Sequence, residues 1–173
     1  MNCLDIYKYY KLKESPFLNH VFTSFTNKSS KLNFEEFVIL LWDLLSQEIS
    51  FYCFYQFDKK KKNKLSFDLV YQMISMIHGA SYNDGIDSVV RSLDVGIGEF
   101  ISSSDFATYA QENKCLLRPI RRIQTYLRTQ IIGEVYWRSM TDIRKIKLPG
   151  KTVFEILSRR EDEIDTNQVK VTL

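Results

Sequence analysis

Oxygen-bearing side chains that could hold a divalent cation occur in two polar segments of the sequence. Asp58 and Ser66 lie in the first segment, and Asp94, Ser102 and Asp105 lie in the second. A calcium ion in a protein takes about six to eight oxygen ligands, many of them from carboxylates. Both segments supply few such ligands.

The first segment is also basic. Its lysines outnumber Asp58 and Asp68, which gives residues 58–69 a net charge of +3. The lysines are Lys59, Lys60, Lys61, Lys62 and Lys64. Like charge repels a cation, and a run of lysines is usually a solvated loop. A more specific hypothesis is that a lysine ammonium folds over Asp58 and holds the loop closed without metal.

The other groups that commonly do chemistry form no recognisable catalytic arrangement. His20 and His78 have no nucleophile partner in a known motif, and the sequence has no glycine-rich phosphate loop. Cys3, Cys53 and Cys115 are far apart, without a paired spacing for metal or redox chemistry. We therefore expect no enzyme, reduced thiols, a cytoplasmic protein, and no cofactor, with calcium as the alternative.

The elements that position these residues are predicted to be helices. Apolar residues recur at spacings of three and four over residues 17–25 and 65–78, and the aromatic segment 49–57 fits a helix between polar breaks. Asn33 and Glu36 form a capping-box pattern, Ser102 or Ser103 can cap a later helix, and Gly79 is a natural helix stop. The helix–loop–helix pattern repeats at roughly 33 to 36 residues.

The segment from Phe57 to Leu69 resembles the calcium-binding loop of EF-hand proteins in the calmodulin superfamily. Asp58, Asn63, Leu65 and Ser66 match loop positions one, six, eight and nine. A first loop matches through Leu32 and Glu36 but has Phe25 at position one, and a third matches through Asp94, Ile101, Ser102 and Asp105. The resemblance covers about residues 17 to 113, and its surroundings look most like calcineurin B and the neuronal calcium sensors. It implies degenerate EF-hands in which the aliphatic residue at position eight joins a neighbouring loop through a short β bridge. On this resemblance we expect the loop of Asp58 and Ser66 to be non-functional and the loop of Asp94, Ser102 and Asp105 to be a weak candidate calcium site.

The resemblance predicts an all-α protein of helix–loop–helix pairs. Residues 1–79 are expected to form an EF-hand-like pair, and residues 80–144 a third unit with a long closing helix from Leu116 to Met140. That helix would cover the third unit or hold a residual fourth hand. Residues 145–173, which are charged and irregular beyond Pro149, are expected to form an extended or disordered tail.

The function that follows is a non-catalytic adaptor or scaffold, in a cytoskeletal or ciliary assembly, whose calcium sites are largely lost. The alternative is a calcium-sensor subunit of an enzyme or motor that uses the third loop. Residues 118–147 carry a local net charge of +6, which suits an acidic protein surface, whereas we expect neither nucleic acid nor membrane as the partner. The residues expected to bind a protein partner are Phe37, Trp42, Phe51, Phe54, Arg121, Arg122, Phe154 and Leu157.

Overall fold

The computed structural model describes residues 2–26, 31–97, 100–149, 151, 153 and 155–156, and for residues 94–97 it describes the backbone alone. Within these ranges the protein is mostly helical, as the sequence predicts. The two short strands of the described part form one antiparallel pair. Phe154 and Leu157, expected to bind a partner, lie outside the described residues.

The first three helices are α1 (Cys3–Tyr9), α2 (Pro16–Phe25) and α3 (Phe34–Ser46). Pro16 occupies the first turn of α2, where its missing N–H costs nothing. The capping box that the sequence predicts for α3 is confirmed, because Asn33 Oδ1 accepts the Glu36 N–H and Glu36 Oε2 accepts the Asn33 N–H, both at 2.8 Å. The sequence did not predict α1, which packs the ring of Tyr7 edge-on against Phe22.

Two helix–strand–helix units follow. The first consists of α4 (Ile49–Phe57), β1 (Lys64–Ser66) and α5 (Phe67–His78), and the second of α6 (Asp84–Ile97), β2 (Phe100–Ser102) and α7 (Ser103–Glu112). In the antiparallel register of β1 and β2, Leu65 lies directly opposite Ile101. Gly79 ends α5 at a φ of 51° and starts the 3-10 turn η1 (Gly79–Ser81). The strand pair joins segments on either side of the boundary expected at residue 79, which stays a prediction.

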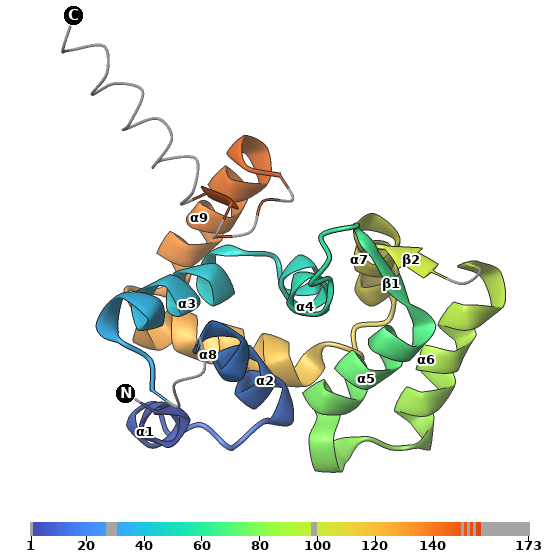
Figure 1. Cartoon of the computed structure of the whole chain (residues 1–173), viewed down its shortest axis with the longest axis horizontal. Helices are drawn as coiled ribbons and strands as arrows, with labels where there is room; N and C mark the ends of the chain where they lie inside the picture. The colour runs from blue at the N-terminus through green and yellow to red at the C-terminus, as the bar shows by residue number, and fades with distance from the viewer. Residues whose placement is uncertain are drawn as a thin grey trace, which may run out of the picture.

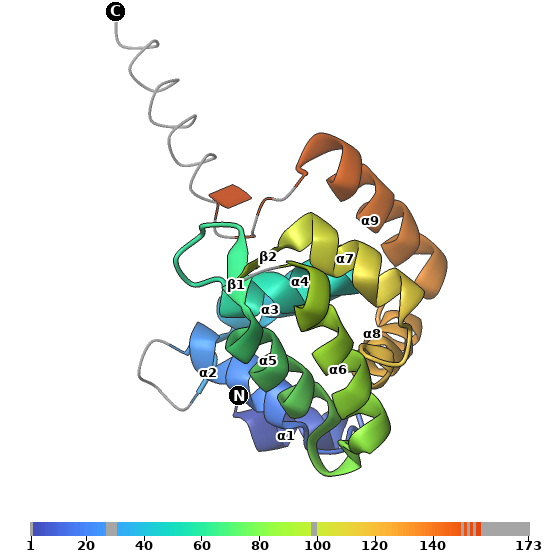
Figure 2. The same cartoon turned by 90° about the vertical axis from the view of Figure 1, so that its right-hand side faces the viewer.

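The long closing helix expected from Leu116 to Met140 is instead two helices, α8 (Arg118–Gln130) and α9 (Glu134–Lys147). The chain reverses between them because Ile132 and Gly133 have positive φ angles of 68° and 126°. A φ of 126° is accessible mainly to glycine, and the Gly133 N–H donates to the Arg128 carbonyl at 3.1 Å, which closes the end of α8. Gly133 is the residue in the sequence that indicates this break between two helices. Figures 1 and 2 show α9 leaving the end of α8 at a steep angle and lying next to α3 at the edge of the molecule.

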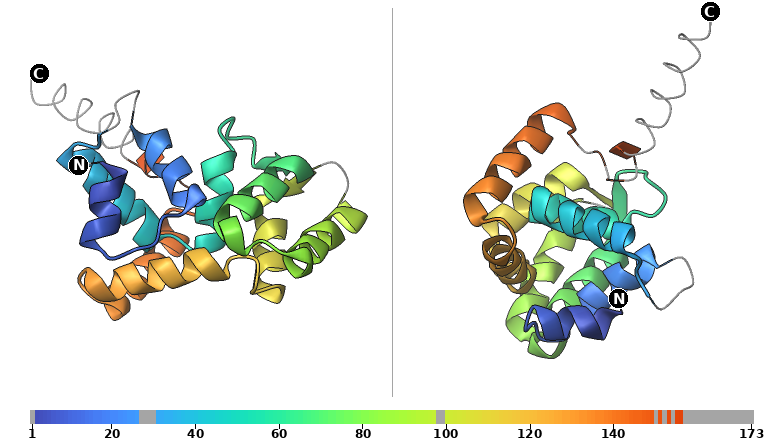
Figure 3. Two further views of the ribbon diagram at one scale, coloured as in Figure 1. Left: turned by 90° about the horizontal axis from the view of Figure 1, so that it is seen from below. Right: turned by 90° about the vertical axis from the view of Figure 1, so that its left-hand side faces the viewer.

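One continuous hydrophobic core connects the first three helices with the two helix–strand–helix units. Phe17, Tyr52, Phe54 and Phe106 are fully buried, and they come from α2, α4 and α7. Helix α8 contacts α3, α4 and α5, and Figure 3 shows it extending lengthwise beneath them. It therefore joins α3 to the first of the two helix–strand–helix units.

The expected tail begins later than residue 145, since α9 continues to Lys147. Val153 is only 3% exposed and belongs to the core cluster. Beside it, Glu155 Oε1 lies 3.6 Å from Lys61 Nζ. The first part of this segment is thus packed against the body of the protein, and residues 157–173 lie outside the described part.

The register of the strand pair can be tested by truncation. Leu65→Ala removes a 1% exposed side chain and should lower the free energy of unfolding by about 2–5 kcal/mol. Because Leu65 and Ile101 face each other, the double variant Leu65→Ala/Ile101→Ala should cost less than the sum of the single variants. Phe100→Ala, at a 50% exposed strand position, is the control and should cost less than about 1 kcal/mol. Urea unfolding followed by circular dichroism measures all four, and strict additivity would contradict the register.

Candidate functional site

The loop after α4 is closed by backbone groups. Asp58 caps the end of α4, and its carboxylate accepts the Lys62 N–H at 3.1 Å and the Asn63 N–H at 2.6 Å. Lys61 and Asn63 adopt left-handed backbone conformations, with φ of 49° and 54°, which turn these N–H groups toward the carboxylate. The sequence hypothesis of a lysine ammonium over Asp58 is replaced by this arrangement. Both oxygens of the predicted first ligand are thereby engaged by their own loop.

Two of the remaining predicted metal ligands, Ser66 and Ser102, serve as helix caps. Ser66 Oγ accepts the Leu69 N–H at the start of α5, and Ser102 Oγ accepts the Asp105 N–H at the start of α7. Ser102 also donates to Asp105 Oδ2 at 2.6 Å. Asp94 lies within α6, whose helical backbone continues to Ile97, and its side chain is outside the described part. In the described ranges, no group of three or more His, Cys, Asp or Glu side chains is placed to hold a metal ion.

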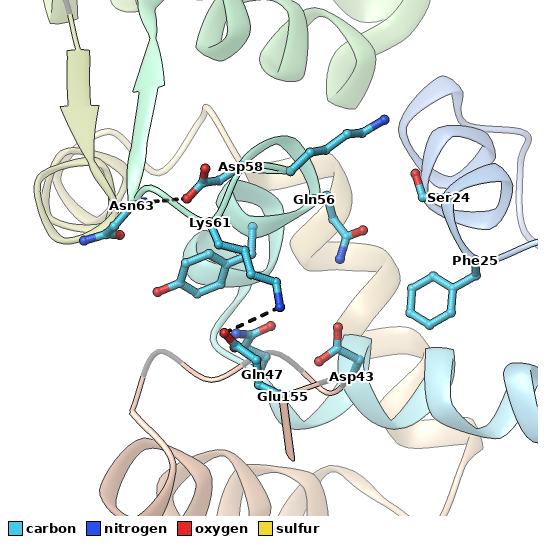
Figure 4. A pocket seen from close by; sticks show the side chains of 11 residues that line it. Ser24, Phe25, Asp43, Gln47, Gln56, Asp58, Lys61, Asn63 and Glu155 are labelled. Atoms are coloured by element: carbon cyan, nitrogen blue, oxygen red, sulfur yellow. Dashed lines mark hydrogen bonds and ion pairs between the residues drawn. The ribbon is translucent and has the colours of Figure 1, made fainter. Parts of the chain in front are cut away.

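A polar cavity of about 580 Å³ borders the closed loop (Figure 4). Three carboxylates line it, Asp43, Asp58 and Glu155. Each is already held by the protein: Asp58 by the loop N–H groups, Glu155 by Lys61, and Asp43 by Arg144 at 2.7 Å. The cavity is therefore a junction of internal contacts between α2, α3, α4 and the segment after α9.

The C-terminal end of α3 is held by side chains from α8. Gln124 Nε2 donates to the carbonyls of Leu44 and Gln47 at 2.7 and 2.9 Å, and Arg128 donates from two nitrogens to the Leu45 carbonyl. The last carbonyls of a helix have no partner within it, so burial requires donors from elsewhere. A cation there also interacts favourably with the helix dipole. These side chains let α3 end inside the protein.

Arg144 of α9 completes this polar cluster. It is 4% exposed, pairs with Asp43, donates to Ser46 Oγ at 2.9 Å and stacks over the Trp42 ring at 4.7 Å. Burial raises the pKa of Asp43, and the adjacent Arg144 guanidinium opposes that rise. Burial likewise lowers the pKa of Arg128, while Glu134 opposes the change. In the sequence Arg128 and Arg144 contribute to the +6 charge of residues 118–147, because charge density alone does not show which arginines face inward.

The aromatic residues expected to bind a partner are mainly structural. Phe54 is fully buried and Phe37 is 9% exposed, so both belong to the core. Trp42 lies under Arg144 and is partly buried. Phe51 is half-buried and lines an apolar groove of about 300 Å³ with Leu148 and Pro149.

Arg121 and Arg122, the other predicted partner-binding residues, are exposed on α8. They line a surface groove of about 690 Å³, which we name the basic groove. Its residues are Lys114, Arg118, Arg121, Arg122, Thr125, Tyr126 and Thr129. Within the described part of the chain, none of its four cationic side chains forms an ion pair. The structure thus brings together Arg121 and Arg122 with two cations that the sequence did not single out as partner-binding.

The two histidines have structural contacts. The His20 ring stacks on Phe57 with ring centroids 4.7 Å apart, and burial lowers its pKa. His78 Nε2 lies 2.9 Å from the Leu116 carbonyl, which ties α5 to the start of α8. Both histidines therefore contribute to packing between helices.

No family model, curated protein or solved structure matches this chain. The helices of the described ranges are each too short or too polar to cross a membrane.

The closed loop predicts a metal-independent fold. Asp58→Ala should lower the free energy of unfolding by about 1–3 kcal/mol, since the Lys62 and Asn63 N–H groups lose their acceptor. The control Asp68→Ala removes an equal charge from the exposed first turn of α5 and should cost less than about 1 kcal/mol. Urea midpoints of the wild-type chain should be the same in millimolar calcium and in EDTA. A calcium-dependent rise in the midpoint would contradict this interpretation.

The buried pair between α3 and α9 can be tested by uncoupling it. Arg144→Leu should cost about 3–5 kcal/mol, because Asp43 stays buried without its cation. Arg138→Leu, which breaks the exposed pair with Glu134, should cost less than about 1 kcal/mol. Replacing both partners, as Asp43→Leu/Arg144→Leu, should recover part of the loss. Thermal and urea unfolding report the differences, and equal effects of Arg144→Leu and Arg138→Leu would refute the buried pairing.

Proposed function

We propose that this chain is a non-catalytic adaptor, built on EF-hand-like units, that binds an acidic segment of a partner protein in the basic groove and does so without calcium. The observation that carries the proposal is the cluster of cations in the basic groove, none of which is ion-paired within the described residues. The sequence expectation of a cytoskeletal or ciliary setting stays a prediction.

The paired units support the EF-hand-like part of the proposal. Leu65 and Ile101, which the resemblance assigns to loop position eight, lie directly opposite each other in the strand pair. Asn63, assigned to the bend at position six, has the left-handed conformation expected for that position. Each loop leads from one helix through a strand into a second helix that is capped by a serine.

Independence from calcium is supported by how the loops are closed. The Asp58 carboxylate accepts two backbone N–H groups of its own loop, which occupies both oxygens. The lysines of residues 59–64 are exposed around it and add positive charge. In the other unit α6 continues through Asp94, so the helix occupies the stretch where an ion-binding loop would begin. The alternative of a calcium sensor is therefore not the one we favour.

An acidic peptide suits the chemistry of the basic groove. Arg118, Arg121 and Arg122 come from the same helix and can pair with carboxylates, and Arg can do so through two hydrogen bonds at once. Thr125 and Thr129 add hydroxyl groups, and the 37% exposed ring of Tyr126 offers an apolar contact. The whole chain carries a formal charge of only +3, which is low for a protein that tracks a nucleic-acid backbone.

Binding of a fluorescent glutamate-rich peptide, followed by anisotropy, tests the proposal. Arg121→Glu/Arg122→Glu should weaken binding at least about tenfold, a loss of about 1.4 kcal/mol, because attraction becomes repulsion at two positions. The control Lys8→Glu/Lys13→Glu changes the net charge equally at exposed sites in and just after α1 and should bind like the wild type. Added salt should weaken binding by screening.

The same measurement includes duplex DNA of similar charge as a competitor. We expect the peptide to remain bound at physiological salt when the competitor is present. Displacement by DNA at lower concentration than by unlabelled peptide would overturn the proposal in favour of a nucleic-acid interface. Equal peptide binding by the groove variant and the control variant would overturn it as well.

A further inference from the structure

Helix α9 has an apolar stripe on the side that faces away from the protein. Val135 is 83% exposed, Tyr136 44%, Ile143 42% and Ile146 79%. Ile132, just before the helix, is 72% exposed. We name these five residues and Ser139, which is also exposed, the outer stripe. Figure 2 shows no described helix on this side of α9.

The face of α9 opposite the outer stripe is anchored to the rest of the protein. Trp137 and Arg144 are each 4% exposed. The Trp137 indole donates to the Ile131 carbonyl, and Arg144 is paired with Asp43. Thr141 accepts from Arg128, on the same side. One face of α9 is buried through Trp137 and Arg144, and the other is apolar and exposed. A helix with an exposed apolar face of this kind is typical of a protein–protein interface.

Ile132 adds a second unfavourable feature at the same place. A β-branched residue with a φ of 68° is a genuine backbone outlier, and its side chain is also largely in water. Strain of this kind persists where the surrounding structure requires it, commonly at binding sites. Burial of Ile132 in an interface would offset its exposure.

Four of the five apolar residues of the outer stripe, all except Tyr136, are placed symmetrically about Ser139. Val135 and Ile143 lie about one helical turn before and after Ser139, and Ile132 and Ile146 lie about two turns before and after it. In an antiparallel pair of identical helices that cross at Ser139, a residue before Ser139 on one helix lies opposite the residue at the same distance after Ser139 on the other. A small residue at the crossing point lets two helices approach closely.

We propose that the outer stripe of α9 is a homodimer interface in which α9 of a second copy of this chain packs antiparallel to it, with the two-fold axis at Ser139. In such an interface a residue that contacts another is contacted by the same residue in return. Val135 faces Ile143 of the second copy, and Ile132 faces Ile146.

The charges beside the stripe fit this arrangement. Arg138 and Asp142 are exposed and lie on either side of Ser139 along the same flank of the helix, and Arg138 already pairs with Glu134 one turn earlier in α9. In the antiparallel pair Arg138 of one copy approaches Asp142 of the other, so the attraction occurs twice. A helix that carries charges of one sign would repel either Arg138 or Asp142, whereas a second copy places unlike charges opposite each other, which is why a second copy is the favoured occupant.

One helix face is smaller than the roughly 800 Å² per partner of a standard interface. We therefore expect a reversible dimer with a dissociation constant in about the micromolar range. The outer stripe is separate from the basic groove, so the dimer does not depend on the proposed function. A dimer would present two basic grooves, and a partner with two acidic segments would gain avidity.

Charge pairing across the axis tests the proposal with the full-length chain. Val135→Glu alone and Ile143→Lys alone should each abolish the dimer in sedimentation velocity, because each buries an unpaired charge against an aliphatic residue. The double variant Val135→Glu/Ile143→Lys should restore dimerisation, since each introduced carboxylate then faces an introduced ammonium of the other copy. Both positions are exposed, and circular dichroism should confirm unchanged helical structure in each variant.

A second variant locates the axis. Ser139→Cys should form a disulfide between two copies under mild oxidation, and the control Ala80→Cys, exposed in the turn after α5, should not. The groove variant Arg121→Glu/Arg122→Glu should still dimerise, so failure of the groove proposal and failure of this one are separate results. A wild-type chain that stays monomeric at high micromolar concentration overturns the proposal. That result is the one expected if residues 157–173 or an acidic partner helix, and not a second copy, cover the outer stripe. Failure of the double variant to dimerise where the wild type does would also overturn it.

Discussion

The burial of the C-terminal end of α3 is the constraint on which the rest of the structure depends. A helix that ends inside a protein leaves carbonyl groups without hydrogen-bond donors, and water cannot reach them. Here Gln124 and Arg128 of α8 supply those donors, while Arg144 of α9 pairs with Asp43 in the last turns of α3. These contacts fix where α8 and α9 lie. They also explain why two arginines in a basic stretch are buried.

That same constraint decides which surfaces remain free. Once Arg128 and Arg144 face inward, Arg118, Arg121 and Arg122 are left on the outer side of α8, and the aliphatic residues of α9 are left on its outer side. The basic groove and the outer stripe are therefore two consequences of one packing arrangement. The proposed adaptor function would use such separate surfaces, and here they lie on the two helices that the α3 end holds in place.

The loops show how a helix–loop–helix unit can keep its shape without an ion. Asp58 accepts backbone N–H groups from Lys62 and Asn63, and the left-handed conformations at Lys61 and Asn63 make that geometry accessible. Leu65 and Ile101 then hold the two loops together across the strand pair. Hydrogen bonds and apolar contacts thus close both loops, as the proposed calcium-independent binding requires.

The resemblance to EF-hand loops, and not periodicity, assigned Leu65 and Ile101 to equivalent loop positions. The local features could be predicted from the sequence: the helical character, the capping box at Asn33, the stop at Gly79 and a serine cap for α7. These follow from periodicity and from bonds between residues a few positions apart, which are visible in one dimension. Tertiary structure decided the break at Gly133, the pairing across residue 79, and which arginines are buried. Those outcomes depend on partners distant in the chain, such as Leu45 for Arg128 and Asp43 for Arg144. No local pattern shows the direction in which a charged side chain will point when a helix end elsewhere needs it.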